Sequence, residues 1–322
     1  MTDASAAGDL LDLTNSHLPN LNSVELCPQL RILDLTANRF TSIDPRILAL
    51  TGLVSLNFRQ NLLTDASQWS QAACKSTLTD LELRDNQLKE IPDLSGFSSL
   101  TRLEVSYNEI KSLGPLAHLP GSAPLQQLYV ASNKISNIAS LSHLTALTTL
   151  ELGCNRIRSI CNLEALTGLK ELWLGRNRIA ALEHLEHLRH LVRLSVQSNR
   201  LESMQGLEQC TALEELYLSH NGIRRMEGLA SLTRLNILDV SSNSISRVEG
   251  LEGLGLLRDL WLNDNAIAAV DASLEQALQP VAASLTCLYL EGCPAAKDPE
   301  YKERLRKMLP GLQQLDADMM VT

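Results

Sequence analysis

Residues 169–190 read Leu-Lys-Glu-Leu-Trp-Leu-Gly-Arg-Asn-Arg-Ile-Ala-Ala-Leu-Glu-His-Leu-Glu-His-Leu-Arg-His. Apolar residues and one asparagine occupy fixed places in these 22 residues, in the order L-x-x-L-x-L-x-x-N-x-I-x-x-L-x-x-L-x-x-L. Leu172 and Leu174 alternate with outward residues, as in a short strand that has one buried face. From Ile179 onward an apolar residue recurs at every third position, which predicts a short helix or 3₁₀ segment with one apolar side.

Most of the remaining sequence consists of further copies of this stretch, and the pattern is that of the leucine-rich repeat. The asparagine, represented by Asn177, follows the strand, where its amide can pair with backbone groups of the turn. It recurs at residues 38, 61, 86, 108, 133, 155, 177, 199, 221, 243 and 265. Degenerate first and last copies place Ser16 and Cys293 in the same position. The sequence therefore predicts about thirteen coils, which stack because one coil cannot bury its own flanks.

The predicted fold is an α/β leucine-rich-repeat solenoid of horseshoe or arc form, with a parallel concave sheet and short helices or 3₁₀ segments on the convex side. We expect a disordered N-terminus over residues 1–9, the solenoid over 10–292 and a C-terminal cap over 293–322. In the cap, Asp298 and Pro299 are expected to begin a helix that ends at Pro310. Irregular spacing predicts insertions that bulge near Trp69, over 120–124 and over 271–283.

Composition and charge exclude several classes of function. The net charge of −9 and the lack of a basic run argue against nucleic acid as a partner and favour a partner with a basic surface. No signal peptide and no 18-residue apolar stretch are evident, so we expect neither secretion nor a membrane span. The seven cysteines include no C-x-x-C pair. Cys27 and Cys210 are expected to be buried in place of leucine, in a reducing compartment.

One outward residue in each coil lies between the two buried strand leucines, and these residues should form a line along the sheet. In chain order the line contains Asp12, Asp34, Asn57, Glu82, Glu104, Tyr129, Glu151, Trp173, Ser195, Tyr217, Asp239, Trp261 and Tyr289. Neighbouring outward positions add Asp80, Arg84, Asp85, Tyr107, Glu171, Arg176, Glu215, His220, Asp259, Asp264 and Glu291.

Aromatic residues are only 3% of the chain, yet five of the eleven fall on this line. Strand propensity explains one or two aromatic residues on a sheet surface, but it does not explain five on one solvated line. Tyr and Trp are common anchors of protein interfaces. The line from Glu104 to Tyr289 would span roughly 38 Å at the usual strand spacing, which matches a protein partner better than a metabolite.

A search for catalytic and ligand motifs finds none. There is no phosphate-binding Gly-rich loop, no G-x-S-x-G and no H-E-x-x-H. His184, His187 and His190 lie three residues apart and could be taken for metal ligands. They alternate with buried leucines, so we interpret them as solvated spacers on the convex side. No enzyme activity, metal or cofactor is therefore predicted.

The chain resembles a particular family of repeat proteins. The coils from Asn133 to Asn265 contain LELGCNRI, LWLGRNRI, LSVQSNRL, LYLSHNGI, LDVSSNSI and LWLNDNAI, and the end reads CPAAKDPEYKERLRKMLPGLQQLDA. These segments are similar to the leucine-rich-repeat regulatory subunits of type-1 serine/threonine protein phosphatase (protein phosphatase 1 regulatory subunit 7). The ordered strand segments carry the resemblance more specifically than the cap does.

The resemblance implies that the chain is a non-catalytic regulator that binds the phosphatase catalytic subunit through its concave face and controls its activity, maturation or targeting. Matching the motifs of the family assigns partner binding to Glu104, Tyr129, Glu151, Trp173, Asp239, Asp259, Trp261 and Tyr289. We add Tyr217 to this set because it lies on the same outward line. It also implies a ternary complex with a small phosphatase inhibitor and a place in both nucleus and cytoplasm. We expect the free chain to be a monomer, with no nucleic-acid or membrane partner.

Three other interpretations remain open at this point. The repeats could form a scaffold for another protein, because axonemal and spliceosomal proteins have similar repeats and caps. The chain could be an enzyme, which would require a convergent polar pocket. It could also be a structural spacer, for which the aromatic line would have no function.

Overall fold

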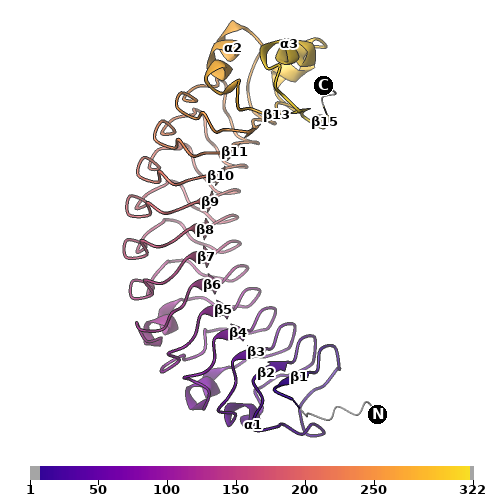
Figure 1. Ribbon diagram of the computed structural model, residues 1–322, viewed down its shortest axis with the longest axis vertical. Helices are drawn as coiled ribbons and strands as arrows, with labels where there is room; N and C mark the ends of the chain where they lie inside the picture. Colours follow the sequence, from indigo (N-terminus) through magenta and orange to yellow (C-terminus); the bar gives the residue numbers. More distant parts are fainter. Residues whose placement is uncertain (1–7, 320–322) are drawn as a thin grey trace. The chain divides into compact units, whose positions relative to one another are not determined.

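The computed structural model describes residues 8–319 and separates the chain into two compact units, residues 1–156 and 157–322, here unit 1 and unit 2. Each unit is a stack of coils, and each coil contributes one short strand (Figure 1). The strands are three residues long, except for the last two, β14 and β15, which have two residues. Residues 1–7 of the expected N-terminal segment lie outside the described part of the chain.

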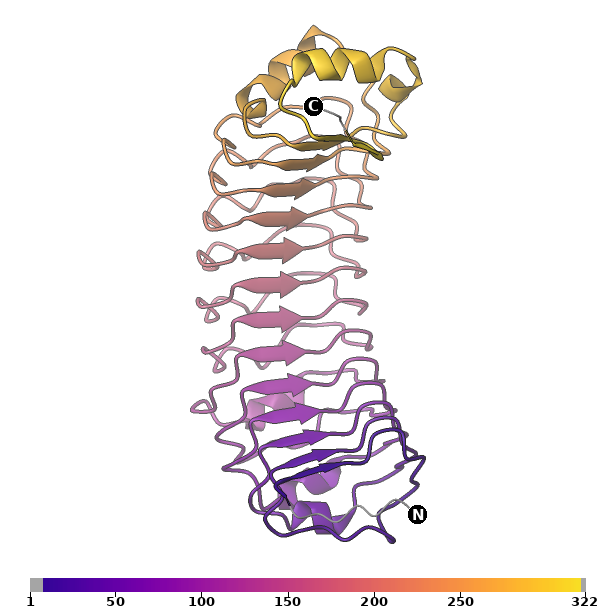
Figure 2. The same cartoon turned by 45° about the vertical axis from the view of Figure 1, so that its right-hand side comes forward.

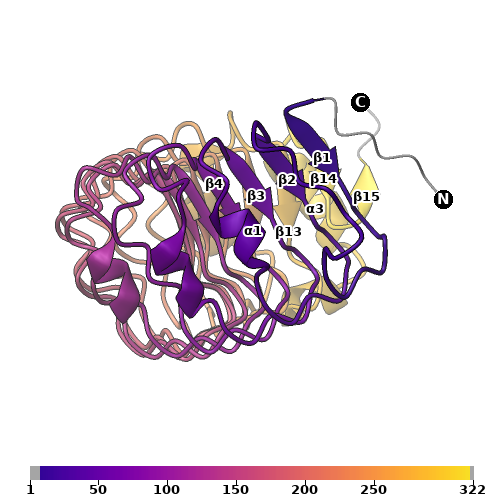
Figure 3. The same cartoon turned by 90° about the horizontal axis from the view of Figure 1, so that it is seen from below.

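Unit 1 contains seven parallel strands that pair in chain order, and Figure 2 shows them side by side. They are β1 (Leu10–Asp12), β2 (Ile32–Asp34), β3 (Ser55–Asn57), β4 (Asp80–Glu82), β5 (Arg102–Glu104), β6 (Gln127–Tyr129) and β7 (Thr149–Glu151). Figure 3, seen from below, shows the first coils of this unit one behind the other. The middle residue of each strand is a buried leucine, as the alternating pattern predicts.

Unit 2 continues the same design. Its strands β8 to β14 are parallel neighbours in chain order, and β15 pairs antiparallel with β14. They are β8 (Glu171–Trp173), β9 (Arg193–Ser195), β10 (Glu215–Tyr217), β11 (Ile237–Asp239), β12 (Asp259–Trp261), β13 (Cys287–Tyr289), β14 (Gln314–Leu315) and β15 (Asp318–Met319).

The turn asparagines join neighbouring coils. Asn133 donates from Nδ2 to the carbonyl of Val130 in its own coil, at 3.2 Å, and to that of Val105 in the preceding coil, at 3.0 Å. Its Oδ1 accepts the backbone N–H of Ile110 at 2.9 Å. In the described residues, 11 coils carry this asparagine, and the count of thirteen predicted from the sequence also includes the first and last repeats, which lack it. In the last, Cys293 donates from Sγ to the carbonyl of Leu262 at 3.2 Å.

The backs of the coils contain fewer helices than the sequence predicts. Helical segments occur in the irregular coils: α1 (Pro45–Leu48), α2 (Ala272–Leu278), and the 3₁₀ helices η1 (Ser67–Gln71), η2 (Gly114–His118) and η3 (Gln279–Val281). Regular coils instead use consecutive turns, such as Leu188 N–H to Leu185 carbonyl at 2.9 Å and Leu191 N–H to Leu188 carbonyl at 3.1 Å. A helix cannot run through the predicted segment from Ile179 to Leu188, because His184 within it has a φ of +59°.

The insertions contribute to the core as well as to the surface. Trp69 in η1 is fully buried and makes an edge-to-face contact with Phe97, with the ring centroids 6.1 Å apart. The insertion over 271–283 forms α2 and η3, whose Leu274, Leu278 and Val281 are buried. These two insertions therefore do not simply bulge into solvent.

The C-terminal segment covers the last coil of unit 2 with η4 (Pro294–Lys297) and α3 (Tyr301–Met308), at the top of Figure 1. The helix begins at Tyr301 rather than at Pro299, and Asp298 Oδ1 accepts the N–H of Glu300 at 2.9 Å. Asp316 joins the segment to the coil by accepting the Tyr301 hydroxyl at 2.6 Å and the N–H of Leu290 at 2.7 Å.

Two cysteines differ in burial, although the sequence predicts both to be buried. Cys210 is fully buried, and burial raises the pKa of its thiol to about 12. Cys27 is half-exposed. It belongs to the first coil, which within residues 8–319 has a neighbouring coil on one side only, so this position is less covered.

Candidate functional site

The predicted line of outward residues exists in each unit. Its members are the third residues of the strands, and they are paired in register along the sheet. In unit 1 the register places Glu104 beside Tyr129 and Tyr129 beside Glu151. We call the side of each sheet that carries these residues the strand face. It also carries the first residue of each strand, because side chains alternate with a period of two.

Carboxylates around one arginine dominate the strand face of unit 1. Arg102, the first residue of β5, lies 3.0 Å from Asp80, 3.0 Å from Glu82 and 3.7 Å from Glu104. Its guanidinium also lies 5.2 Å from the centre of the Tyr129 ring, which is within the range of a cation–π contact. Tyr129 is thus placed beside the acidic residues from which the sequence predicts a partner-binding surface.

Burial makes these carboxylates costly to ionise. Glu104 is 4% exposed, and Glu82 and Glu151 are half-buried. Desolvation raises the pKa of all three, and in Glu82 the neighbouring Glu104 raises it further. Arg102 and Arg84 oppose this effect without cancelling it. Groups with perturbed pKa values are frequent at functional sites. A cation of a partner would favour the ionised form of these carboxyls.

Four rings form a continuous stack on the strand face of unit 2, which we call the aromatic stack. Trp173 and Tyr217 lie nearly parallel, with ring centroids 6.5 Å apart and planes 17° apart. Tyr217 and Trp261 follow at 6.4 Å, and Trp261 and Tyr289 at 6.1 Å in an edge-to-face contact. Four of the sequence-predicted binding residues are therefore brought together.

Small and polar residues lie beneath the stack. Trp173 and Tyr217 belong to strands that are two apart, so they would be about 10 Å apart if they stood upright. They lean together over Ser195, which is 2% exposed, while Tyr217 and Trp261 lean over Asp239, which is 5% exposed. The line is therefore less solvated than the sequence predicts, because the rings cover the residues between them. Asp239 Oδ1 accepts the backbone N–H and the hydroxyl of Ser241 at 3.0 and 2.6 Å.

Asp259 lies on the same face as Trp261, as the first residue of β12. Desolvation raises the pKa of its carboxyl. Beside it, burial raises the pKa of the Cys287 thiol to about 11. The indole N–H of Trp261 is buried and has no oxygen or nitrogen acceptor within residues 8–319.

A hollow of about 520 Å³ runs along the strand face of unit 2 beside the aromatic stack. Asp239, Trp261 and Tyr289 line one part of it, and Arg176, Ser219 and His220 line another. It is polar and open to solvent, so it can receive the side chains of a partner.

Two arginines of the strand faces are absent from the predicted set. Arg102 and Arg193 are both first residues of a strand, two positions before the line that the sequence analysis followed. The first strand residues of three successive coils are Glu171, Arg193 and Glu215, each 22 residues after the one before. This charge alternation is the signal that could have found Arg193.

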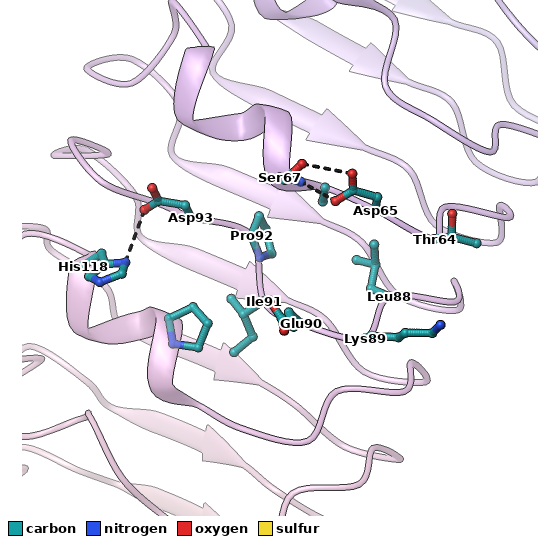
Figure 4. Close-up of a pocket in the computed structure, with 12 residues that line it drawn as sticks. Thr64, Asp65, Ser67, Leu88, Lys89, Glu90, Ile91, Pro92, Asp93 and His118 are labelled. Atoms are coloured by element: carbon teal, nitrogen blue, oxygen red, sulfur yellow. Dashed lines mark hydrogen bonds and ion pairs between the residues drawn. The ribbon is translucent and has the colours of Figure 1, made fainter.

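A depression of unit 1 lies away from the strand face, and its described residues form no catalytic arrangement (Figure 4). It has a volume of about 600 Å³, between η1 and η2. Ser67 donates its hydroxyl to Asp65 at 2.9 Å, and His118 Nδ1 lies 3.6 Å from Asp93. The serine and the histidine thus have separate carboxylate partners and do not form a nucleophile–base pair.

The three histidines of residues 169–190 are exposed on the back of one coil, as predicted. Across residues 8–319, no three His, Cys, Asp or Glu side chains are grouped as they would be around a metal ion. Within the same residues, no helix has the length and apolar character needed to cross a membrane.

Comparison with known proteins gives two matches at the level of sequence. The profile of the family described as Leucine Rich repeats (2 copies) matches residues 125–167 and 211–253. Over 97 residues the chain is 45% identical to a protein phosphatase 1 regulatory inhibitor subunit homologue of Arabidopsis thaliana. That match covers 29% of this chain and 29% of the relative.

Solved structures share the fold of the chain. An internalin of Listeria monocytogenes has a TM-score of 0.84 at 24% identity, over 97% of this chain and 87% of the other. The functional domain of InlJ from the same organism has a TM-score of 0.71 at 21% identity, over 95% and 66%. A leucine-rich-repeat protein of Leptospira interrogans has a TM-score of 0.68 at 23% identity, over 94% of both chains.

The coil geometry, the repeat profile and these structures agree with one another. The parallel strands and stacked coils of each unit confirm the predicted leucine-rich-repeat fold. The chain has the leucine-rich-repeat fold, and over 29% of its length it is similar to a regulatory subunit of protein phosphatase 1.

Proposed function

We propose that the chain is a regulatory subunit that binds the catalytic subunit of protein phosphatase 1 through its strand faces and controls its activity, maturation or targeting. The aromatic stack of unit 2 carries this proposal. The sequence similarity to a phosphatase regulatory subunit supports the choice of partner.

The aromatic stack has the character of an interface anchor. Its four residues are half-buried, so each ring still offers part of its surface, while contacts with its neighbours hold it in place. Tyr and Trp are enriched among the residues that dominate binding energy, at roughly 2 kcal/mol or more on truncation. A stack of this kind has no evident use in folding, because the leucines on the other side of each strand already fill the core.

The acidic residues of unit 1 favour a partner with a basic surface. Burial raises the pKa values of Glu82, Glu104 and Glu151, which makes the ionised form of each carboxyl costly. An approaching cation stabilises that ionised form. The net charge of −9 acts in the same direction by attracting a basic partner at long range. Under the proposal, Glu104, Tyr129 and Glu151 contact the catalytic subunit, as do Asp239 and Asp259 in unit 2.

The test is a calorimetric titration with the purified catalytic subunit. The double variant Trp173→Ala with Trp261→Ala should bind about a hundredfold or more weakly than the wild type, because it lacks two anchors. The matched control is His187→Ala with His190→Ala, which alters the exposed back of a coil. Undiminished binding by a folded Trp173→Ala, Trp261→Ala variant would overturn the proposal.

An affinity purification from native cells separates this proposal from the alternative partners. The proposal predicts recovery of the phosphatase catalytic subunit. Recovery of axonemal or spliceosomal components without the phosphatase would favour a scaffold of that type instead. We further propose a ternary complex with a small phosphatase inhibitor, and action in both nucleus and cytoplasm, which the same purification from separated fractions tests.

A further inference from the structure

Arg193 occupies the centre of a charged group on the strand face of unit 2. It is the first residue of β9, and the sheet register places it between Glu171 of β8 and Glu215 of β10. Its guanidinium donates to Glu171 at 2.8 Å and to the two oxygens of Glu215 at 2.5 and 2.6 Å. The planar fork of arginine suits this double contact, which fixes its orientation.

The same group holds two rings of the aromatic stack. The guanidinium carbon of Arg193 lies 5.6 Å from the centre of the Trp173 ring. Glu215, which Arg193 anchors, accepts the hydroxyl of Tyr217 at 2.9 Å. Arg193 therefore contacts one ring directly and the next through a carboxylate, and these two rings are the nearly parallel pair.

The protonation states of the group suit these contacts. The hydrogen bond from Arg193 lowers the pKa of Glu215, so this carboxylate is an ionised acceptor at neutral pH. Burial, and then the contact with Glu215, raises the pKa of Tyr217 to about 12, so its hydroxyl remains a donor. The arrangement should thus persist across the physiological range of pH.

Unit 1 contains a partly similar arrangement. Arg102 is also the first residue of its strand, bridges the carboxylates of Asp80 and Glu82, and lies 5.2 Å from the Tyr129 ring. In unit 1 both carboxylates come from β4, whereas in unit 2 one comes from each neighbouring strand. What recurs is an arginine that pairs with two carboxylates beside an aromatic ring, which argues for a role beyond one local contact.

We propose that Arg193 is a positioning residue, which holds Trp173 and Tyr217 in the orientation that the partner meets. This inference rests on the proposed function of the strand face. Partly exposed ion pairs contribute little to stability on their own. Such ion pairs affect binding more when they immobilise side chains before the partner arrives. The loss of side-chain entropy then occurs on folding and does not weaken the binding free energy.

The first test compares binding kinetics with the phosphatase catalytic subunit. Arg193→Ala should dissociate about tenfold faster than the wild type, with a smaller change in association rate. Arg193→Lys should recover only part of the loss, because an ammonium can approach Trp173 but cannot span both carboxylates. Arg225→Ala is the matched control, since it removes another Arg–Glu pair, 3.0 Å from Glu249, on the back of a coil.

A double-mutant cycle distinguishes positioning from direct contact. In a Trp173→Ala, Tyr217→Ala background, Arg193→Ala should cause no further loss of affinity, because the rings that it positions are absent. A further loss of about tenfold in that background would mean that Arg193 touches the partner itself, and would overturn the positioning role.

A spectrum of the free chain keeps this test separate from the proposed function. The near-ultraviolet circular dichroism of the Trp173–Tyr217 pair should weaken in Arg193→Ala and persist in Arg225→Ala. If the wild type does not bind the catalytic subunit, the proposed function fails. The spectrum alone then decides whether Arg193 orders the rings, and an unchanged spectrum in Arg193→Ala would overturn that role. If the wild type binds, equal affinity of Arg193→Ala overturns the inference whatever the spectrum shows.

Discussion

Glu104 illustrates the conflict between stability and binding at the scale of one residue. Glu104 is 4% exposed, and its carboxylate accepts the backbone N–H of Ser106 at 2.7 Å and lies 3.7 Å from Arg102. Burial nevertheless raises its pKa above the ordinary value of 4.5. A group of this kind favours folding when protonated, so its contribution is fully present below pH 4.5 and is lost as the pH rises through the folded-state pKa.

Glu104→Gln should therefore be as stable as the wild type near pH 4 and more stable at pH 7, because glutamine keeps the contact with Ser106 without a buried charge. Thermal unfolding at the two pH values measures this. The exposed Glu202→Gln serves as a control for the loss of one surface carboxylate. The same Glu104→Gln change should weaken binding of the catalytic subunit. A variant that is less stable at pH 7 than the wild type would contradict the account.

At the scale of the element, left-handed backbone positions shape each coil. The residue before each turn asparagine has a positive φ, as in Arg176, His220 and Asp264. A second such position recurs on the back of the coils at Ser140, Asn162, His184, Gly206, Gly228 and Gly250. At Gly206 a Cβ would lie 1.8 Å from the carbonyl oxygen of Leu182, so this coil requires glycine.

His184→Gly should raise the free energy of unfolding by about 0.5–1 kcal/mol, because glycine adopts a φ of +59° without the steric cost that a Cβ brings. His187→Gly, three residues later in the same coil, should lower it by a similar amount through added chain entropy. Urea unfolding of the two variants measures the difference. Equal shifts for both would show that the left-handed turn does not determine the shape of the coil.

The aromatic stack also depends on how neighbouring strands are arranged, because two rings can meet only over a small residue on the strand between them. Ser195→Leu should weaken binding of the catalytic subunit about tenfold, since the larger side chain forces Trp173 and Tyr217 apart. Ser195→Ala should bind like the wild type. Both variants should keep the fold, because position 195 lies on the strand face and not in the core. Calorimetry would contradict this reasoning if the leucine and alanine variants bound equally well.

At the scale of the molecule, the sequence predicts the repeat, the parallel strands and the outward line, because each follows from a strict period of 22 and the alternation of a strand. The left-handed positions are harder to see, since Arg176 and His220 are not residues that reveal a positive φ. The lean of the rings over Ser195 and Asp239 depends on contacts between strands, which no single coil encodes. Arg193 is missed because its partners lie 22 residues away on each side.

The central claim is that the catalytic subunit of protein phosphatase 1 occupies the strand face. Hydroxyl-radical footprinting of the chain alone and in the complex tests it without altering any residue. The account predicts protection of Trp173, Tyr217, Trp261 and Tyr289 in the complex, with unchanged reactivity of His184, His187 and His190 on the back of a coil. A complex in which the aromatic stack keeps the reactivity of the free chain would contradict the account.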